Sequence, residues 1–343
     1  MKKIEFSAKA KRITLIAISV ILAVVLVVLI VATAYMESVL NLINKKPDDS
    51  LMSSDEYKEF LENQTETMDS NFTGESINPD DVQWGENTDN MVNADHIINI
   101  VLVGQDRRPG EGRQRSDVMI LCTLDTESKE LTMTSFMRDM YVPISGYKDN
   151  KMNATYAFGG MKLLTKCLED NFGVRVDGMV EVDFGGFVDL IDLIGGVEIE
   201  LSNSEANYLI RKGHNAISGW NILYGEAALE HTRNRTVGNG DFSRTERQRE
   251  VINAMIKKCK GMSLTQLNSL LTKALPMITT NMSNKEIMNY LVEVFPLLSG
   301  LEIHTQQIPA DGTYKYAYFD HAGSVLLPDL EANRDILKEI LTQ

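Results

Sequence analysis

Apolar and polar residues divide the chain into three zones. A run without charged residues extends from residue 13 to residue 35, and a mostly polar stretch follows it to residue 95. From residue 96, short apolar runs alternate with amphipathic stretches. Alternating strand-like and helix-like segments are typical of an α/β domain. The pattern therefore predicts one folded domain over residues 96–343, preceded by an N-terminal part of a different kind.

Within the predicted domain, length and spacing separate strands from helices. Short β-rich runs on either side of a polar turn predict a hairpin over residues 117–136. Apolar positions at helical spacing that end at a glycine predict a helix over residues 244–261. Further strands are predicted at residues 96–104, 178–184, 197–201, 301–310 and 314–319, and further helices at residues 159–173, 185–196, 264–275 and 284–299. No repeat or second linker interrupts this series, so one domain is the simplest organisation.

The uncharged run of residues 13–35 is long enough to cross a bilayer as a helix. Residues 1–12 contain four lysines and one arginine against a single glutamate, so the positive-inside rule keeps this tail in the cytoplasm. A cleaved signal peptide is the alternative, because Ala32-Thr33-Ala34 resembles a cleavage site, but the apolar run is longer than that of a signal peptide. We predict a single-pass membrane protein with an extracytoplasmic domain.

Negative charge is concentrated between the predicted anchor and the predicted domain. The formal net charge of the chain is −14, and residues 47–95 alone contain 14 acidic residues against one lysine. A stretch so charged and so poor in apolar residues indicates a solvated, partly disordered spacer. We therefore predict an acidic linker over residues 36–95, and the overall acidity says little about the ligand of the domain.

The three cysteines, Cys122, Cys167 and Cys259, show no paired spacing. An odd number without such spacing argues against a disulfide framework or a zinc knuckle, and predicts buried or inactive thiols. An extracytoplasmic domain that does not use disulfides fits the outer face of a bacterial plasma membrane.

Arginines gather in two short segments that contain no lysine. The first holds Arg107, Arg108, Arg113 and Arg115 between Asp106 and Asp117, and the second, residues 231–250, holds Arg233, Arg235, Arg244, Arg247 and Arg249. A planar guanidinium group binds phosphate through two parallel hydrogen bonds. The alternative is pairing with surface carboxylates, worth about 0–1 kcal/mol for each pair. Two such clusters beside glycine-rich loops favour a phosphate-rich ligand such as a pyrophosphate.

Spacing within the second segment predicts which side chains act together. Arg233 and Arg235 alternate on a segment that reads as extended, so they are expected to point the same way. On the following helix, Arg244, Arg247 and Gln248 are expected to share a face, whereas Arg249 is expected at the solvated surface. Asp241 stands near the start of this helix, and capping of the helix is the alternative to a role in ligand binding.

Asp106 and Asp117 flank the first arginine segment. Mg²⁺ typically binds one or two carboxylates together with phosphate oxygens, so this pair predicts a phosphate-metal site. The alternative is that each carboxylate neutralises a neighbouring arginine. The chain has no Walker A loop, nucleophile elbow or zinc-protease helix, so the nucleophile of any reaction is expected to belong to the substrate.

Five segments occur in the order found in the LytR-CpsA-Psr (LCP) family. They are VLVGQDRRPGEGRQRSDVMIL, TMTSFMRDMYVPI, KMNATYAFGG, VEVDFGGFVDLIDLIGGVEIEL and EAALEHTRNRTVGNGDFSRTERQREVI, and they extend over about residues 97–256. The chain therefore resembles an LCP protein. The resemblance implies a three-layer α/β/α domain with a central mixed sheet and a hydrophobic pocket for a polyprenyl chain, preceded by one transmembrane helix.

The resemblance also implies a reaction. LCP proteins transfer an anionic glycopolymer, of the wall teichoic acid or capsular polysaccharide type, from an undecaprenyl-pyrophosphate carrier to a peptidoglycan sugar hydroxyl. The new bond is a phosphodiester, and Mg²⁺ or Mn²⁺ assists. On this sequence the metal-associated carboxylates are Asp106 and Asp117, and the pyrophosphate-binding arginines are Arg115, Arg138, Arg233, Arg235 and Arg244. His231 and Thr155 depart from the usual family pattern, which affects details of the pocket.

We therefore predict a membrane-bound glycopolymer transferase that does not bind nucleic acid. The predicted catalytic residues are Asp106, Asp117, Arg138, Arg233 and Arg235, and the predicted substrate-binding residues are Arg115, Lys151, Asn153, Asp241, Arg244, Arg247 and Gln248. Two alternatives stay open: a membrane-anchored regulator that binds nucleic acid, and a lipid-pyrophosphate hydrolase that uses water as the acceptor.

Overall fold

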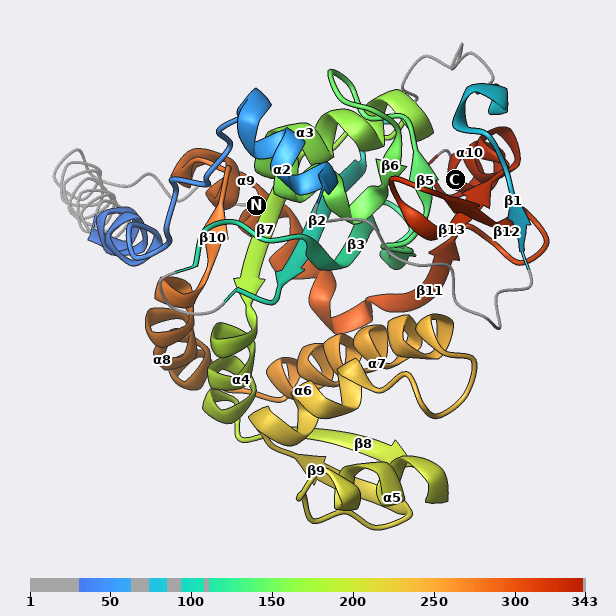
Figure 1. Ribbon diagram of the computed structural model, residues 1–343. Coiled ribbons are helices and arrows are strands. Elements are labelled where there is room, and N and C mark those ends of the chain that lie inside the picture. Colours follow the sequence, from blue (N-terminus) through green and yellow to red (C-terminus); the bar gives the residue numbers. More distant parts are fainter. Residues whose placement is uncertain (1–30, 63–73, 85–93, 108–110, 342–343) are drawn as a thin grey trace, which may run out of the picture. The chain divides into compact units, whose positions relative to one another are not determined.

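The computed structural model describes residues 31–62, 74–84, 94–107 and 111–341 (Figure 1). The chain divides into two units, Met1–Leu42 and Ile43–Gln343. In the first unit, residues 31–40 are helical, and most of the predicted anchor, residues 13–30, lies outside the described residues. Among the described helices, none combines the length and the apolar character that crossing a bilayer requires. The single-pass topology stays a prediction.

A six-stranded mixed sheet forms the centre of the unit Ile43–Gln343. In order across the sheet, the strands are β10 (Thr279–Thr280), β7 (Gly178–Asp183), β2 (Ile97–Gln105), β3 (Ser116–Asp125), β4 (Glu130–Phe136) and β11 (Glu302–Ile308). The pairs β7–β2 and β4–β11 are parallel, and the other three pairs are antiparallel. The hairpin predicted over residues 117–136 is therefore confirmed as β3 and β4.

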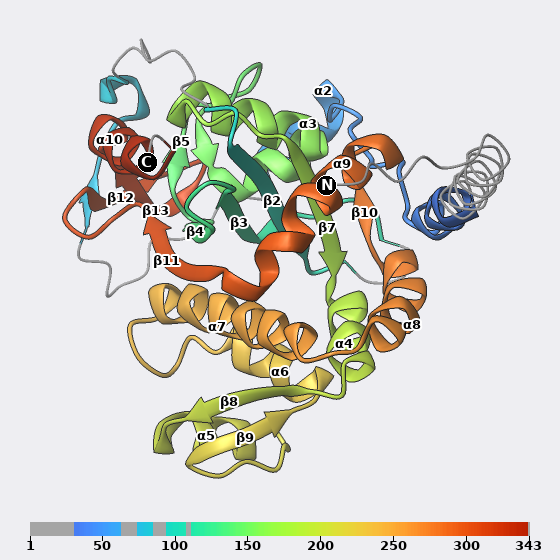
Figure 2. The same cartoon turned by 180° about the vertical axis from the view of Figure 1, so that it is seen from behind.

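Helices cover both faces of this sheet (Figures 1 and 2). On one face lie α3 (Met152–Phe172) and α10 (Leu330–Leu341), which contact each other. On the other face lie α4 (Phe184–Leu193), α6 (Gly225–Arg233), α7 (Asp241–Lys260) and α8 (Leu264–Ala274). The predicted mixed α/β fold with a central mixed sheet is therefore confirmed.

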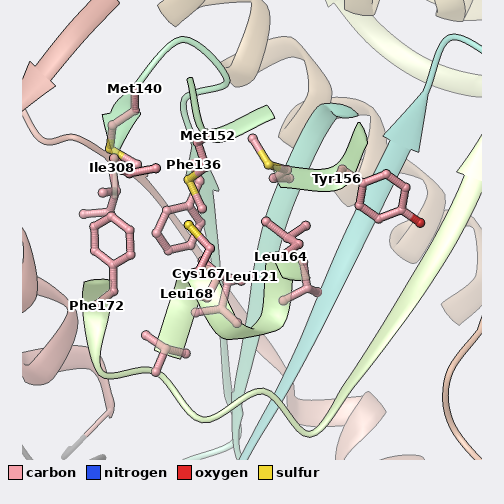
Figure 3. Close-up of a cluster of buried hydrophobic side chains, with 14 of the residues drawn as sticks. Leu121, Phe136, Met140, Met152, Tyr156, Leu164, Cys167, Leu168, Phe172 and Ile308 are labelled. Atoms are coloured by element: carbon pink, nitrogen blue, oxygen red, sulfur yellow. The ribbon is translucent and has the colours of Figure 1, made fainter. Parts of the chain in front are cut away.

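The main apolar core lies between α3 and the sheet (Figure 3). Leu164 and Leu168 are four residues apart and so share one face of α3, which lies against Leu121 and Phe136 of the strands. The rings of Phe136 and Phe172 meet edge to face, with centroids 5.1 Å apart. Each of these buried side chains contributes about 1.5–3 kcal/mol through removal from water. This core holds the loops at the carboxyl ends of the strands on a rigid base.

α3 starts earlier than the helix predicted at residues 159–173, and it bends at two glycines. Gly160 has a φ of +61°, which favours glycine, and a Cβ there would overlap the carbonyl oxygen of Asp48. The guanidinium group of Arg113 holds the same segment, because it donates to the carbonyl oxygens of Asp48 and Ser50. The chain before α2 (Ser54–Glu62) is thus fastened over the bend.

Part of the predicted acidic linker belongs to the folded unit. Met52, Tyr57, Phe60 and Trp84 pack against the main core, and β1 (Glu75–Ser76) pairs with β12 in a small peripheral sheet. The interpretation as a solvated spacer is therefore wrong for the described residues 43–62 and 74–84, and the folded unit begins before residue 96. The physical reason is that a few large apolar side chains anchor a segment that its net charge alone would assign to solvent.

Two predicted strands are present but lie outside the central sheet. β8 (Val197–Leu201) pairs with β9 (Gly219–Leu223) beside α5 (Asn203–Arg211), and β12 (Tyr314–Phe319) pairs with β13 (Gly323–Pro328). Beyond α8, the helix predicted at residues 284–299 divides into α9 (Asn284–Val294) and a 3₁₀ helix, η3 (Phe295–Gly300). A further pair, β5 (Tyr141–Val142) and β6 (Asn150–Lys151), precedes α3.

The cysteines form no disulfide. All three are free, and burial raises the pKa of the Cys122 and Cys167 thiols to about 12. Since the thiolate is the reactive form, these two thiols are inactive near neutral pH. The prediction of buried or inactive thiols is confirmed for both.

Candidate active site

The predicted carboxylates and Arg138 meet at one edge of the central sheet. Asp106 follows β2 and Arg138 follows β4, whereas Asp117 lies at the start of β3. Because β3 is antiparallel to both of its neighbours, the three positions fall at the same edge. Open α/β sheets bind their ligands outside the carboxyl ends of the parallel strands, where these side chains lie.

A polar pocket of about 430 Å³ lies at this edge. Its lining includes six of the predicted site residues, Asp106, Arg115, Asp117, Arg138, Lys151 and Asn153, together with Met52, Phe60, Arg113, Gln114, Asp139 and Ala157. The guanidinium group of Arg115 stacks on the Phe60 ring, with its central carbon 4.8 Å from the ring centroid. Residues that are distant in sequence therefore form one charged pocket.

Arg138 occupies the middle of an ion-paired chain in this polar pocket. Its Nη1 lies 2.6 Å from Asp117 Oδ1, and its Nε lies 3.2 Å from Asp139 Oδ2. Lys151 Nζ lies 3.5 Å from the other oxygen of Asp139. Burial by itself would lower the pKa of Arg138, but Asp139 and Asp117 hold that pKa above its ordinary value. The main-chain amide of Asn153 donates to the Arg138 carbonyl, which fixes the loop against the start of α3.

Arg244 is a buried cation with incomplete hydrogen bonding. Its side chain is 3% exposed, and its Nη1 lies 2.7 Å from Asp241 Oδ1. Its Nε and Nη2 have no hydrogen-bond partner among the described residues. Burial and the nearby Arg138 lower the pKa of Arg244 to about 10. A buried donor without an acceptor is costly, so this guanidinium group suits an anionic ligand that completes its hydrogen bonds.

Arg233 and Arg235 do not lie on an extended segment, so that prediction is wrong. α6 continues to Arg233, and the chain leaves the helix at Asn234. Arg233 Nη2 lies 3.7 Å from Asp106 Oδ2, whereas Arg235 Nε lies 3.2 Å from Asp241 Oδ1. Packing of α6 on α4 and α7 imposes helical geometry over a short stretch in which two-residue alternation is a weak signal. The two arginines consequently serve different carboxylates.

Asp241 does not cap α7 with its side chain. The cap position is occupied by Gly240, and no side-chain hydrogen bond caps this helix. The Asp241 carboxylate instead lies between Arg235 and Arg244, at 3.2 and 2.7 Å. It therefore orients two of the predicted phosphate-binding arginines.

Arg247 and Gln248 do not line the polar pocket. The same holds for Arg233, Arg235, Asp241 and Arg244, of which Arg233 pairs with Asp106 in the pocket. Arg247 Nε donates to Glu205 Oε1 at 2.7 Å, and its two terminal nitrogens donate to the carbonyl oxygens of Asn234 and Val237. These contacts tie α7 to α5 and to the loop that carries Arg235. Gln248 lines an apolar cavity on the α4 side of the sheet. The structure therefore gives Arg247 a positioning role rather than a place in the polar pocket.

Other arginines of the two segments serve the fold. Arg249 was expected at the surface, but it is buried, and its Nη1 donates to Ser135 Oγ at 2.6 Å because this face of α7 packs on β4. Arg107 lies 3.3 Å from Glu181 and 3.6 Å from Asp183. Both side chains are thus occupied by protein partners.

Sequence reasoning missed Asp139 and a buried network around Glu181. Glu181 accepts hydrogen bonds from the Tyr156 hydroxyl and from Gln105 Nε2, both at 2.6 Å. Gln105 Oε1 in turn accepts from the amide of Gln114, which closes the base of the loop that carries Asp106. Asp139 directly follows Arg138 in the sequence, and that adjacency was an available signal. Glu181 carried no such signal, because its position in the alternating pattern of a strand predicts only that the side chain is buried.

The apolar cavity has a volume of about 920 Å³ and lies between the sheet and the helices α4, α6, α7 and α8. Leu102, Val118 and Val182 form its sheet wall, and Phe184 and Phe187 line it from α4. Arg233 contacts one lining residue of each space, because its guanidinium carbon lies 5.0 Å from the centroid of the Phe184 ring in the cavity and its Nη2 lies 3.7 Å from Asp106 Oδ2 in the polar pocket. Arg233 therefore links the apolar cavity to the polar pocket.

The donor set of the polar pocket fits a hard divalent cation. Asp106 and Asp117 both line the pocket, and one or two carboxylates with phosphate oxygens are the usual ligands of Mg²⁺. In the structure each carboxylate is paired with an arginine, Asp106 with Arg233 and Asp117 with Arg138. Within the described part of the chain, the grouping of three potential metal-binding side chains lies elsewhere, at Glu130, Glu302 and His304.

Comparison with known proteins places this arrangement in a family. The LytR_cpsA_psr family matches residues 54–332. The chain belongs to this family. The predicted resemblance to LCP proteins is therefore confirmed, and the match includes most of the segment that was predicted as a linker.

Individual LCP proteins and their structures are also similar to the chain. It is 32% identical over 252 residues to the polyisoprenyl-teichoic acid–peptidoglycan teichoic acid transferase TagU of Bacillus mycoides, a match that covers 70% of this chain and 80% of TagU. It is 28% identical to the regulatory protein MsrR of Staphylococcus aureus, with 74% and 76% covered. The structure of YwtF (TagT) of Bacillus subtilis with bound octaprenyl pyrophosphate lipid matches with a TM-score of 0.55 and 26% identity, and covers 73% of this chain and 92% of YwtF.

Proposed function

We propose that this LCP protein transfers an anionic glycopolymer from an undecaprenyl-pyrophosphate carrier to a sugar hydroxyl of peptidoglycan, with formation of a phosphodiester. The polymer belongs to the wall teichoic acid or capsular polysaccharide type. The observation that carries the proposal is the contact of Arg233 both with Phe184, which lines an apolar cavity, and with Asp106, which lines a pocket that holds three guanidinium groups. A lipid pyrophosphate has this same division into an apolar chain and a compact, multiply charged head.

The relatives support the same division of the ligand. TagU is named for the transfer of teichoic acid from a polyisoprenyl carrier to peptidoglycan, and YwtF was solved with octaprenyl pyrophosphate. In this chain the prenyl group occupies the apolar cavity, and the pyrophosphate lies against Arg138, Arg233, Arg235 and Arg244. The free Nε and Nη2 donors of Arg244, unpaired among the described residues, complete their hydrogen bonds on the phosphate oxygens.

The reaction is a displacement at the sugar-linked phosphorus. The acceptor hydroxyl oxygen forms a bond to this phosphorus, and the bond between the phosphorus and the bridging oxygen of the pyrophosphate breaks. The polyprenyl phosphate leaves with the electron pair, while the hydroxyl proton passes to the carboxylate of Asp106 or Asp117. Arg138 and Arg244 stabilise the negative charge that develops on the phosphate oxygens, as preorganised donors do in phosphoryl transfer.

Mg²⁺ or Mn²⁺ is part of the proposal, and Asp106 and Asp117 are the residues that hold it. Such a cation supplies Lewis-acid polarisation of a phosphate oxygen when it is bound. Arg233 and Arg138, which pair with these carboxylates in the structure, would then be available to the phosphate oxygens. In the same proposal, residues 13–35 anchor the protein in a bacterial plasma membrane with the N-terminus in the cytoplasm, so that the domain faces peptidoglycan.

Transfer from a lipid-linked glycan to a peptidoglycan acceptor tests this function directly. We expect Arg233→Ala and Asp106→Asn to lower the rate by more than about threefold, which corresponds to ~0.7 kcal/mol in the barrier. Rates closer to wild type than that would contradict the assigned site. Undiminished activity of a metal-free protein would contradict only the proposed role of the metal. Release of free glycan phosphate in place of the conjugate would identify water as the acceptor.

A nucleic-acid-binding regulator is less well supported by the geometry, although one relative carries the name regulatory protein. Reading of a phosphate backbone needs exposed cations on an open surface. In this chain Arg244, Arg247 and Arg249 are buried. A reporter fusion that places the C-terminus in the cytoplasm would favour the hypothesis of a nucleic-acid-binding regulator.

A further inference from the structure

The apolar cavity follows the axis of α7 from Gln248 to the end of the helix at Lys260. Its lining residues on this helix are Gln248, Ile252, Met255, Ile256, Cys259 and Lys260. They recur at helical spacing, so the cavity runs along one helix face for roughly 18 Å at 1.5 Å per residue. Gln248 marks the end near the arginines, and Lys260 marks the opposite end.

The cavity reaches the surface at η3, because Phe295 lines it and is 55% exposed. Lys260 also lines the cavity and donates to the carbonyl oxygen of Leu301, directly after η3. Val292, three residues before Phe295, is 69% exposed. α9 has no buried residue, although six of its side chains are apolar or aromatic. They are Ile287, Met288, Tyr290, Leu291, Val292 and Val294. We name Leu291, Val292 and Phe295 the rim.

We propose that the rim docks onto the surface of a phospholipid bilayer, so that a lipid chain passes from the bilayer into the cavity without crossing water. This inference rests on the proposed function, because it takes the cavity to hold a polyprenyl chain. A cavity of about 920 Å³ is the size that drug-like ligands fill, about 300–1,000 Å³. An undecaprenyl chain is far longer than such a ligand, so its far end must leave the cavity at the rim.

The free-energy cost of exposing the end of the prenyl chain to water favours a bilayer as the partner of the rim. Each CH₂ group left in water forgoes about 0.8 kcal/mol, whereas a bilayer receives the chain end at no such cost. The last turn of α7 contributes Lys257, Lys258 and Lys260, of which Lys260 lines the cavity, whereas α9 carries Lys285 against Glu286 and Glu293. Basic residues next to exposed apolar side chains are the composition of segments that bind anionic lipid surfaces.

A second exposed apolar surface serves as the control. Ile217, Trp220, Ile222 and Tyr224 are exposed around β9, but Glu198 and Glu200 lie directly opposite Ile222 and Trp220 on β8. Acidic neighbours disfavour an anionic bilayer, so this surface is expected to stay in water. Ile217 is 67% exposed and therefore matches Val292 closely.

The test uses the full chain in vesicles of phosphatidylglycerol and phosphatidylcholine with brominated acyl chains. We expect the emission added by Val292→Trp to be quenched about twofold or more beyond that added by Ile217→Trp, since docked apolar side chains reach about 5–10 Å into the bilayer. Equal quenching would overturn the proposal. Shielding of Val292→Trp from both bromolipid and aqueous iodide would assign the rim to a protein partner or a second copy, and would overturn it as well.

An activity measurement separates docking from catalysis. We expect Val292→Glu to lower transfer from a vesicle-embedded long-chain donor about tenfold, while transfer from a water-soluble short-chain donor changes less than about twofold. Ile217→Glu is expected to change neither rate. Equal losses with both donors would contradict docking, whereas a wild-type protein that transfers from neither donor would contradict the proposed function and leave the quenching result to decide on docking.

Discussion

Arg244 Nη1 lies 2.7 Å from Asp241 Oδ1, while Nε and Nη2 of the same guanidinium group find no hydrogen-bond acceptor among the described residues. Arg247, one turn further along α7, donates from all three of its nitrogens to Glu205 and to two main-chain carbonyls. The two buried arginines of α7 thus differ in how many of their nitrogens find a hydrogen-bond acceptor in the protein. Arg244 is arranged for a ligand, and Arg247 is arranged for the fold.

Exchange of these two arginines for methionine is expected to affect different quantities: ligand binding for Arg244 and stability for Arg247. Arg244→Met should keep the free energy of unfolding within about 1 kcal/mol, because it removes a poorly compensated buried charge, but it should weaken pyrophosphate binding about tenfold or more. Arg247→Met should cost about 3–5 kcal/mol, because it strands Glu205 and two carbonyls. Thermal unfolding and calorimetric titration with pyrophosphate measure both quantities. A large loss of stability in Arg244→Met would show that its charge serves the fold.

Asp139 should make stability depend on pH on the acid side. Burial by itself would raise the pKa of this carboxyl, but Arg138 and Lys151 hold it below its ordinary value of 3.8. The stabilisation is therefore present above pH 3.8 and is lost as the pH falls through the lowered pKa. Asp139→Asn should cost about 1–3 kcal/mol at pH 7, and its difference from wild type should shrink below pH 3.8. A constant difference across denaturation curves from pH 3 to 7 would contradict the ion-paired chain.

Filling the apolar cavity should weaken binding of the lipid and leave binding of pyrophosphate nearly unchanged. Met255 lines the cavity on α7, so Met255→Trp is expected to weaken binding of a polyprenyl phosphate about tenfold, with binding of inorganic pyrophosphate changed less than about twofold. Ile210→Trp, at an exposed position outside the cavity, is the matched control and should change neither affinity. Unaltered polyprenyl phosphate binding in Met255→Trp would place the lipid elsewhere.

Glu181 should hold the loop that carries Asp106. Tyr156→Phe removes one hydrogen bond to this buried carboxylate and is expected to cost about 1.5–3 kcal/mol. Glu181→Ala also frees Gln105 and Arg107, and should cost about 3–5 kcal/mol. Chemical denaturation measures both changes. Equal losses in the two variants would show that Gln105 and Arg107 do not depend on Glu181.

Local sequence pattern predicted most elements of the fold. The hairpin of β3 and β4 follows from two β-rich runs around a polar turn, and α7 follows from an apolar stripe that stops at Gly261. These signals suffice because strands and helices impose fixed periods on the side chains that they bury. Pairing is not local, and for this reason β8 and β12 were predicted as strands while their separation from the central sheet was not.

The sequence by itself determined the family, the α/β class and the two stretches in which arginines concentrate. Only the tertiary structure decided the role of each arginine. It buried Arg244 with donors to spare, and it engaged Arg107 and Arg249 with Glu181 and Ser135. The physical reason is that the energy of a buried charge depends on which distant groups the packed helices and strands bring within hydrogen-bond reach, and spacing along the chain does not encode that distance.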